Sequence, residues 1–131
     1  MAASVAMFTL LVDEYEGGIA FYRDALGLEL LADTDMGGGK RWVVLSGPAG
    51  GRILLAKAVG ERQQATIGNQ SGGRVGFFME TDDFARDHAA FVAKGVTFRE
   101  APRYESYGTV AVFEDPYGNA WDLIEPKRPE K

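Results

Sequence analysis

The stretch VFEDPYGNAWDLIEP, residues 112–126, contains two apolar runs joined by a turn. Asp115, Pro116 and Gly118 stand at the first, second and fourth positions of that turn, where a type I turn favours an acid, a proline and a glycine. Gly118 can also adopt the positive φ of a bulge residue, which suits the twist of a hairpin. The stretch therefore predicts two antiparallel strands near the end of the chain.

An acid, Asp122, lies in the middle of the second of these strands. Successive side chains of a strand point to opposite faces, so Asp122 points away from the face that Trp121 and Leu123 occupy. Its carboxylate therefore meets either water or an enclosed site. A carboxylate in an enclosed site is a candidate for binding or chemistry.

The hairpin is echoed earlier in the chain. With an offset of 68 residues, SGPAGGRILLA (46–56) falls on EDPYGNAWDLI (114–124), and LGLEL (26–30) falls on KGVTF (94–98). The signals for strands, helices and turns agree in order and spacing between the two halves. The sequence therefore predicts one domain, residues 1–131, built from two related modules. Module 1 is expected at about 5–57, a polar glycine-rich linker at about 58–73 and module 2 at about 74–126.

Each module is expected to fold as β-α-β-β-β, which makes the fold class α+β. Helices are predicted over 16–27 and 84–95, each stopped by a glycine, with Asp82 or Asp83 as the N-cap of the second helix. The predicted strands cover 5–12, 28–33, 40–46, 51–57, 74–80, 96–100, 108–114 and 120–125.

Composition excludes several classes of site and partner. The 131 residues carry a formal charge of −5 with no cluster of Lys and Arg, so their field would repel nucleic acid. Cysteine is absent, which excludes disulfides, thiolate metal ligands and cysteine nucleophiles. No apolar run approaches the length of about 18 residues that a membrane span needs, and no secretion signal opens the chain. We therefore expect a cytoplasmic protein with no nucleic-acid or membrane partner.

Together these features resemble the vicinal oxygen chelate superfamily, which includes glyoxalase I, bleomycin-resistance proteins and extradiol dioxygenases. The likeness rests on the doubled module, on FYRDALGLEL (21–30) after the first strand and on the terminal hairpin, and it runs from about residue 5 to 126. It implies two mixed sheets curled around a cup-shaped pocket. In the enzymes of this family, a divalent metal is held there by the first and last strands of each module.

The metal-ligand positions of that family map onto Met7, Leu54, Val75 and Asp122. Only Asp122 is a hard ligand, whereas a catalytic Zn, Ni, Fe or Mn ion needs about three nitrogen or oxygen ligands from the protein. The one histidine, His88, lies in a predicted helix away from the strands that would line the cup. We therefore expect no metal and no other cofactor, and we assign no catalytic residue.

Strand alternation predicts which side chains face the pocket. We expect the ligand-binding residues to be Met7, Thr9, Arg52, Leu54, Val75, Phe77 and Asp122. Whether Trp42 with Val44, or Arg41 with Val43, shares this face stays open. So does the possibility that the pocket is filled by its own side chains or closed by a second subunit.

The leading hypothesis is a metal-free protein that binds an apolar or aromatic small molecule, with Asp122 pairing with a cationic or hydrogen-bond-donating group. In lacking metal ligands, the chain is similar to the drug-sequestering resistance proteins of the family. The alternative is a glyoxalase-like lyase or isomerase, or a dioxygenase-type enzyme, with an atypical metal site or none. A third hypothesis is a scaffold or partner subunit. Because subunits of this family commonly pair, we also expect a homodimer.

Overall fold

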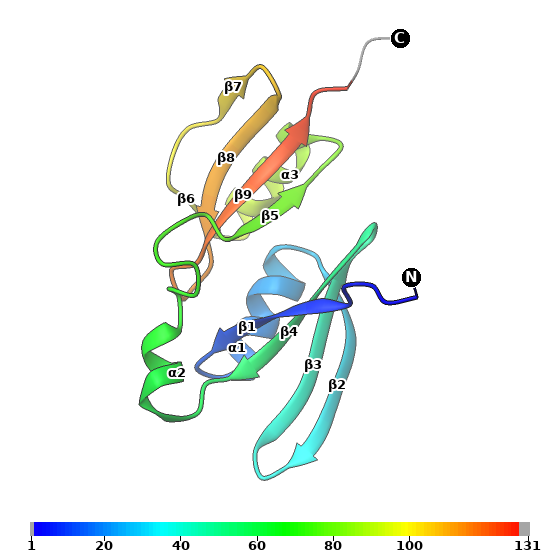
Figure 1. The fold of residues 1–131 in the computed structure, drawn as a ribbon. Coiled ribbons are helices and arrows are strands. Elements are labelled where there is room, and N and C mark those ends of the chain that lie inside the picture. The colour runs from blue at the N-terminus through cyan, green and yellow to red at the C-terminus, as the bar shows by residue number, and fades with distance from the viewer. Residues whose placement is uncertain (1, 129–131) are drawn as a thin grey trace. The chain divides into compact units, whose positions relative to one another are not determined.

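The computed structural model describes residues 2–128 and divides into two compact units, Met1–Ile67 and Gly68–Lys131. Each unit has an open mixed sheet with a helical segment against one face (Figure 1). The N-terminal unit contains β1 (Met7–Val12), α1 (Tyr15–Ile19), the π-helical η1 (Ala20–Ala25), β2 (Glu29–Gly37), β3 (Lys40–Gly47), β4 (Gly50–Lys57) and α2 (Gly60–Thr66). The C-terminal unit contains β5 (Phe77–Glu80), α3 (Phe84–Ala93), β6 (Thr97–Phe98), β7 (Arg103–Glu105), β8 (Gly108–Glu114) and β9 (Ala120–Pro126).

The sheets of the two units have the same topology. The strand order is β1-β4-β3-β2 in the first sheet and β5-β9-β8-β6 in the second, where β7 also pairs with β8. In each sheet the first and last strands of the module are parallel and the other pairs are antiparallel. The predicted α+β fold of two βαβββ modules is therefore confirmed.

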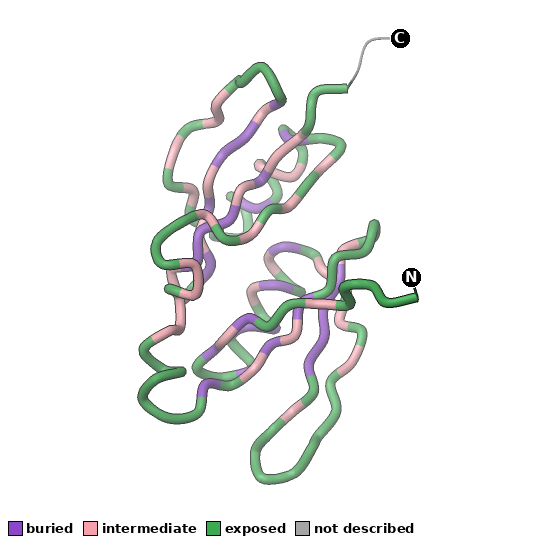
Figure 2. Tube along the Cα trace, viewed as in Figure 1, coloured by how far each residue is buried: buried purple, intermediate pink, exposed green. Residues whose placement is uncertain are grey.

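One face of each sheet forms a core with its helical segment. In the N-terminal unit the most deeply buried side chains are Leu10, Val12, Tyr22, Val43, Leu45 and Leu55. In the C-terminal unit Phe113 makes an edge contact with Phe91 of α3, with ring centroids 5.6 Å apart, and stacks on Trp121 at 5.9 Å. Figure 2 shows these buried segments along the central strands, while the turn end of the β2–β3 hairpin, residues 33–40, is exposed.

The terminal hairpin has the predicted turn. The amide of Gly118 donates to the carbonyl of Asp115 at 3.1 Å, and Gly118 has a φ of +99°. The buried Asp115 carboxylate accepts hydrogen bonds from the amides of Tyr117 and Asn119 and from Asn119 Nδ2, at 2.8–2.9 Å. The N-cap of α3 is also confirmed, because Asp83 Oδ1 accepts from the amide of Arg86 at 3.0 Å.

Several predicted segments differ in the structure. The predicted linker contains α2, whose sequence GERQQAT is rich in good helix formers and whose first turn is closed by a bond from the amide of Val59 to Gln63 Oε1 at 2.8 Å. The predicted strand 96–100 is only the two residues of β6. The strand predicted from residue 74 begins only at Phe77, because Gly72 and Gly73 have φ values of +66° and +92° and the chain is still turning there.

No helix in the described part of the chain is long and apolar enough to cross a membrane.

Candidate functional site

Asp122 lies on β9 with its side chain on the face that α3 does not cover. Its neighbours Trp121 and Leu123 are 5% and 0% exposed, whereas Asp122 and Ile124 are partly exposed. The alternation of the strand thus separates the core from a second, more open face. The predicted orientation of Asp122 relative to Trp121 and Leu123 is confirmed.

The register of the sheet places two apolar side chains beside Asp122. Its partner in β8 is Val112 and its partner in β5 is Phe78. Residues paired across neighbouring strands share a face, so the carboxylate lies between an aliphatic and an aromatic side chain. Phe78 is 65% exposed, which leaves its ring open to a ligand.

A charged pair flanks this face. Arg103 on β7 pairs with Val110 of β8, and its Nε donates to Glu100 Oε1 at 2.8 Å. The second carboxylate oxygen of Glu100 accepts from the amide of Val112 at 2.9 Å. These contacts hold the ion pair of Arg103 and Glu100 next to Val112, the partner of Asp122 in β8.

The environment of Asp122 is unfavourable for its charge. Burial raises the pKa of the Asp122 carboxyl above its ordinary value, the negative charge of Glu100 acts in the same direction, and the positive charge of Arg103 opposes both. Its Oδ1 is buried and has no hydrogen-bond partner among residues 2–128. Buried polar atoms in folded proteins almost always have a partner, so this oxygen is an acceptor with hydrogen-bonding capacity left to use.

Phe77 does not share the face of Asp122, contrary to the prediction. Its partner in the register is Trp121, on which its ring stacks with centroids 4.9 Å apart. It therefore belongs to the face covered by α3, and Phe78 takes the position beside Asp122. Val75, also predicted here, lies two residues before β5 and is partly exposed. The sequence shows two adjacent phenylalanines, one of which must lie on each face of the strand. Only the strand register shows which of them lies beside Asp122.

The predicted residues of the N-terminal unit do lie on one face. Met7 pairs with Arg52 and Thr9 pairs with Leu54 across the parallel strands β1 and β4. Thr9 and Arg52 are exposed, and Met7 and Leu54 are partly exposed. The structure thus brings these four side chains together on a surface that α1 and η1 leave open. Which of them contacts a ligand stays a prediction.

The orientation of β3, which the sequence left open, follows from the register. Val44 pairs with Leu54, so Val44 and Trp42 share the face of the predicted residues. Trp42 is 39% exposed. Arg41 lies on the opposite face, where its guanidinium stands 5.1 Å from the centre of the Tyr15 ring and forms ion pairs with Glu16 and Asp33. Trp42 therefore joins the candidate surface and Arg41 does not.

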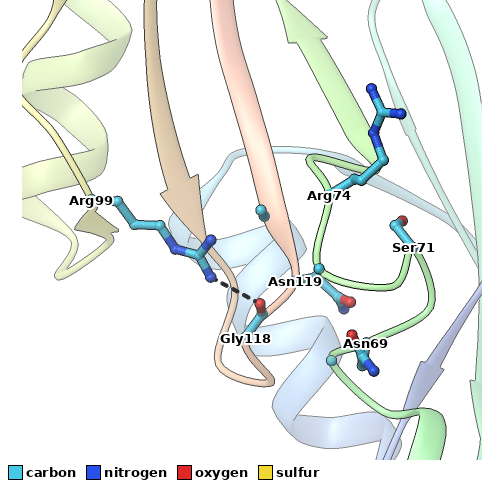
Figure 3. A pocket seen from close by; sticks show the side chains of 9 residues that line it. Asn69, Ser71, Arg74, Arg99, Gly118 and Asn119 are labelled. Carbon is cyan, nitrogen blue, oxygen red and sulfur yellow. Dashed lines mark hydrogen bonds between the residues drawn. The ribbon is translucent and has the colours of Figure 1, made fainter.

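A polar pocket of about 240 Å³ lies within the C-terminal unit, between the segment 68–74 and the terminal hairpin turn (Figure 3). It is lined by Gly68, Asn69, Ser71, Gly73, Arg74, Arg99, Gly118, Asn119 and Ala120. Arg99 Nη2 donates to the carbonyl of Gly118 at 3.1 Å, the contact that is dashed in Figure 3. In the same view the side chain of Arg74 extends away from this carbonyl.

The sequence of the chain matches a known family over most of its length. The family model of the Glyoxalase/Bleomycin resistance protein/Dioxygenase superfamily matches residues 4–123. The chain belongs to this superfamily. The resemblance that the doubled module and the terminal hairpin suggested is therefore confirmed.

Individual proteins are similar to this one along almost the whole chain. An "uncharacterized protein" of Shewanella frigidimarina (strain NCIMB 400) is 45% identical over 128 residues, which cover 95% of both chains. The crystal structure of UcmS2 matches with a TM-score of 0.81 at 25% identity, over 95% of this chain and 99% of that chain. TnmS3, an antibiotic binding protein from Streptomyces sp. CB03234, matches with a TM-score of 0.77 at 28% identity, over 97% of this chain and 99% of that chain.

The side chains around Asp122 do not fit the metal centre of the superfamily's enzymes. The strand partners of Asp122 are Phe78 and Val112, and those of Leu54, the equivalent residue of the N-terminal unit, are Thr9 and Val44. This set supplies one carboxylate, where a catalytic ion needs about three ligands. Nowhere between residues 2 and 128 do three or more His, Asp or Glu side chains gather closely enough to hold a metal ion. His88 instead packs between the rings of Phe84 and Phe98.

Proposed function

We propose that the protein binds a small organic molecule, without a metal, on the sheet faces that its helical segments leave open. The observation that carries this proposal is Asp122 Oδ1, which is buried and lacks a hydrogen-bond partner in the described chain. Leaving a buried acceptor unpaired costs about 1–3 kcal/mol, and a ligand that donates to it recovers part of that cost. The ligand should therefore carry a cationic or hydrogen-bond-donating group.

The surroundings of the carboxylate indicate the rest of the ligand. Within the C-terminal unit, Phe78 and Val112 flank Asp122. The N-terminal unit, taken by itself, carries Trp42 and Met7 on the equivalent face of its own sheet. Exposed aromatic rings favour flat apolar ligands, because they offer a large contact area at a low entropy cost. The similarity to TnmS3, an antibiotic binding protein, supports a ligand of drug-like size.

Acid–base catalysis by Asp122 is the second candidate function. It is favoured by the partial burial of this carboxyl, which raises its pKa, because burial that favours the neutral form prepares a carboxylic acid to donate a proton. Under this proposal the protein is a glyoxalase-like lyase or isomerase, or a dioxygenase-type enzyme, with an atypical metal site or none. Turnover of a bound ligand that is lost in Asp122→Asn would favour this candidate.

We also infer that the protein acts as a homodimer in the cytoplasm and does not bind nucleic acid. Each open sheet has unpaired edge strands, which favour subunit pairing. The formal charge of −5 opposes contact with a phosphate backbone. Light scattering coupled to size-exclusion chromatography would test the dimer, and a mass of one chain would contradict it.

A thermal-shift screen of antibiotics and aromatic amines tests the binding proposal. A compound that binds should raise the melting temperature of the wild-type protein. Isothermal titration calorimetry should then show a dissociation constant about tenfold higher for Asp122→Asn, since a hydrogen bond to a charged group contributes about 1.5–3 kcal/mol.

The matched control is Glu61→Gln, which removes the same charge from an exposed position of α2. We expect this variant to bind like the wild type. If every compound bound equally well to Asp122→Asn, the assignment of Asp122 would be wrong. If no compound bound to the wild type, the binding proposal itself would fail.

A further inference from the structure

The pocket between the segment 68–74 and the terminal turn differs in charge from the rest of the protein. The chain carries 19 acidic and 14 basic residues. The lining of this pocket contains two arginines, Arg74 and Arg99, and no Asp or Glu. The remaining polar side chains of the lining are two asparagine amides and one serine hydroxyl. In a protein with a net negative charge, a pocket lined by basic and neutral polar side chains differs from the average surface.

The walls of the pocket are fixed by close backbone contacts. A Cβ atom on Gly68 would lie 1.9 Å from the carbonyl oxygen of Tyr117, and a Cβ atom on Gly76 would lie 1.7 Å from Ser71 Oγ. At Gly68 the segment therefore touches the turn where only glycine fits, while Gly76 lies against the Ser71 side chain of the segment itself. The amide of Gly76 also donates to the carbonyl of Ala120 at 3.2 Å. The walls of the pocket are thus shaped by contacts within the C-terminal unit.

Several donors in this lining are unused. Arg99 Nε donates to Glu114 Oε2 at 2.8 Å, and its Nη2 donates to the carbonyl of Gly118. The third nitrogen of the guanidinium, Nη1, has no acceptor in the described chain. The side chains of Asn69 and Ser71 form no hydrogen bond with any described residue. Amide, hydroxyl and guanidinium groups can all donate. The pocket therefore presents hydrogen-bond donors from Arg99 and from the segment 68–74, and its lining contains no carboxylate that could accept from them.

We propose that this pocket binds a small oxyanion, the carboxylate or phosphate group of a metabolite. Charge-assisted hydrogen bonds from a guanidinium and neutral donors are the usual way in which proteins hold such groups. The volume of about 240 Å³ leaves room for the anionic group and further atoms of the ligand. The proposal stands apart from the Asp122 site, whose carboxylate attracts the opposite charge.

The test is a titration with inorganic phosphate and, separately, with sodium acetate at constant ionic strength. It is followed through the backbone amide signals of Gly68, Gly73 and Gly118 in two-dimensional NMR spectra. We expect saturable shifts of these signals with at least one of the two anions. The anion that saturates identifies the oxyanion class. Linear, unsaturated shifts with both anions would overturn the proposal.

Asn69→Asp is the decisive variant, because it places a negative charge in the pocket with almost no change of shape. It should weaken anion binding by about tenfold or more, since like charges at close range in a partly buried site repel strongly. Gln64→Glu, which adds the same charge at an exposed position of α2, should bind within about twofold of the wild type. Equal binding by Asn69→Asp and the wild type would overturn the proposal. Because neither variant touches Asp122, failure here is separate from failure of the proposed function.

Discussion

Phe78 and Asp122 occupy paired positions of the parallel strands β5 and β9, so an exposed phenyl ring and a carboxylate with one unpaired buried oxygen stand side by side on one face. One residue earlier, Phe77 and Trp121 form the corresponding pair on the opposite face, where their rings stack. The two neighbouring phenylalanines therefore have different roles. Phe77 holds the sheet to its core, and Phe78 belongs to the proposed binding surface.

Alanine at each of these positions should separate the roles. Phe77→Ala removes a stacked ring from the core side and should lower the free energy of unfolding by about 2 kcal/mol. Phe78→Ala removes a mostly exposed ring and should change that free energy by no more than about 0.5 kcal/mol. Urea unfolding followed by tryptophan fluorescence measures both values. The reverse order of the two effects would contradict the register of β5.

The stability of the protein should depend on the ionisation of Asp122. Its pKa is raised in the folded protein, so the folded state holds the proton more tightly than the unfolded state. The stability that this group contributes is therefore complete below its unfolded pKa of about 3.9 and is lost as the pH rises through the folded pKa.

Asp122→Asn removes this titration. The free energy of unfolding of the variant, relative to the wild type, should therefore rise as the pH is raised from about 4 to 7. The gain should stay within about 1 kcal/mol, because the side chain is only partly buried. Urea unfolding at several pH values measures it. A difference that shrinks with rising pH would show that the carboxylate is stabilised in the fold.

Purified protein without a histidine tag should contain no stoichiometric transition metal. The paired positions around Asp122 are apolar, and a single carboxylate binds Zn, Ni, Fe or Mn too weakly to retain it through purification. Inductively coupled plasma mass spectrometry measures the metal content. One equivalent of metal that disappears in Asp122→Ala would contradict the metal-free proposal.

The sequence predicted the elements of the fold better than the faces of its first strands. The 68-residue offset aligns Leu54 with Asp122, and both lie on the open face of their sheets. In the first strands, Thr9 is the partner of Leu54 and Phe78 is the partner of Asp122. Equivalent positions of β1 and β5 are therefore 69 residues apart, one more than the offset. A shift of one residue moves every side chain of a strand to the other face, which is why Phe77 was assigned wrongly.

The turns were predictable because their residue types have local causes. Asp115 stabilises its turn by accepting from the amide of Tyr117, two residues on. Asp83 caps its helix by accepting from the amide of Arg86, three residues on. The pairing of β5 with β9 depends instead on contacts between residues that are far apart in the sequence, such as Phe77 and Trp121. No local pattern in the Phe77–Phe78 pair states which ring meets Trp121.

Two glycines of the segment 68–74 should differ in their tolerance of alanine. Gly68 has a φ of +75° and no space for a Cβ atom beside the carbonyl of Tyr117, whereas Gly72 has a φ of +66° and open space around it. Gly72→Ala should cost about 1 kcal/mol for its backbone conformation alone, and Gly68→Ala should cost at least about 2 kcal/mol. Thermal or urea unfolding compares them. Equal costs would show that the segment does not rest against the turn.

The terminal turn should depend on the Asp115 side chain, which accepts three hydrogen bonds at a buried position. Asp115→Ala leaves the amides of Tyr117 and Asn119 and the Asn119 side chain without this acceptor, and should lower the free energy of unfolding by about 3 kcal/mol. Asp115→Asn keeps one carbonyl oxygen for the two backbone amides and should cost about 1 kcal/mol.

The control is Asp35→Ala, which removes a single exposed bond to the amide of Gly37 and should cost no more than about 0.5 kcal/mol. Urea unfolding of the three variants gives the order, and a cost for Asp115→Ala no larger than that of the control would mean that the turn is held by its backbone bonds alone.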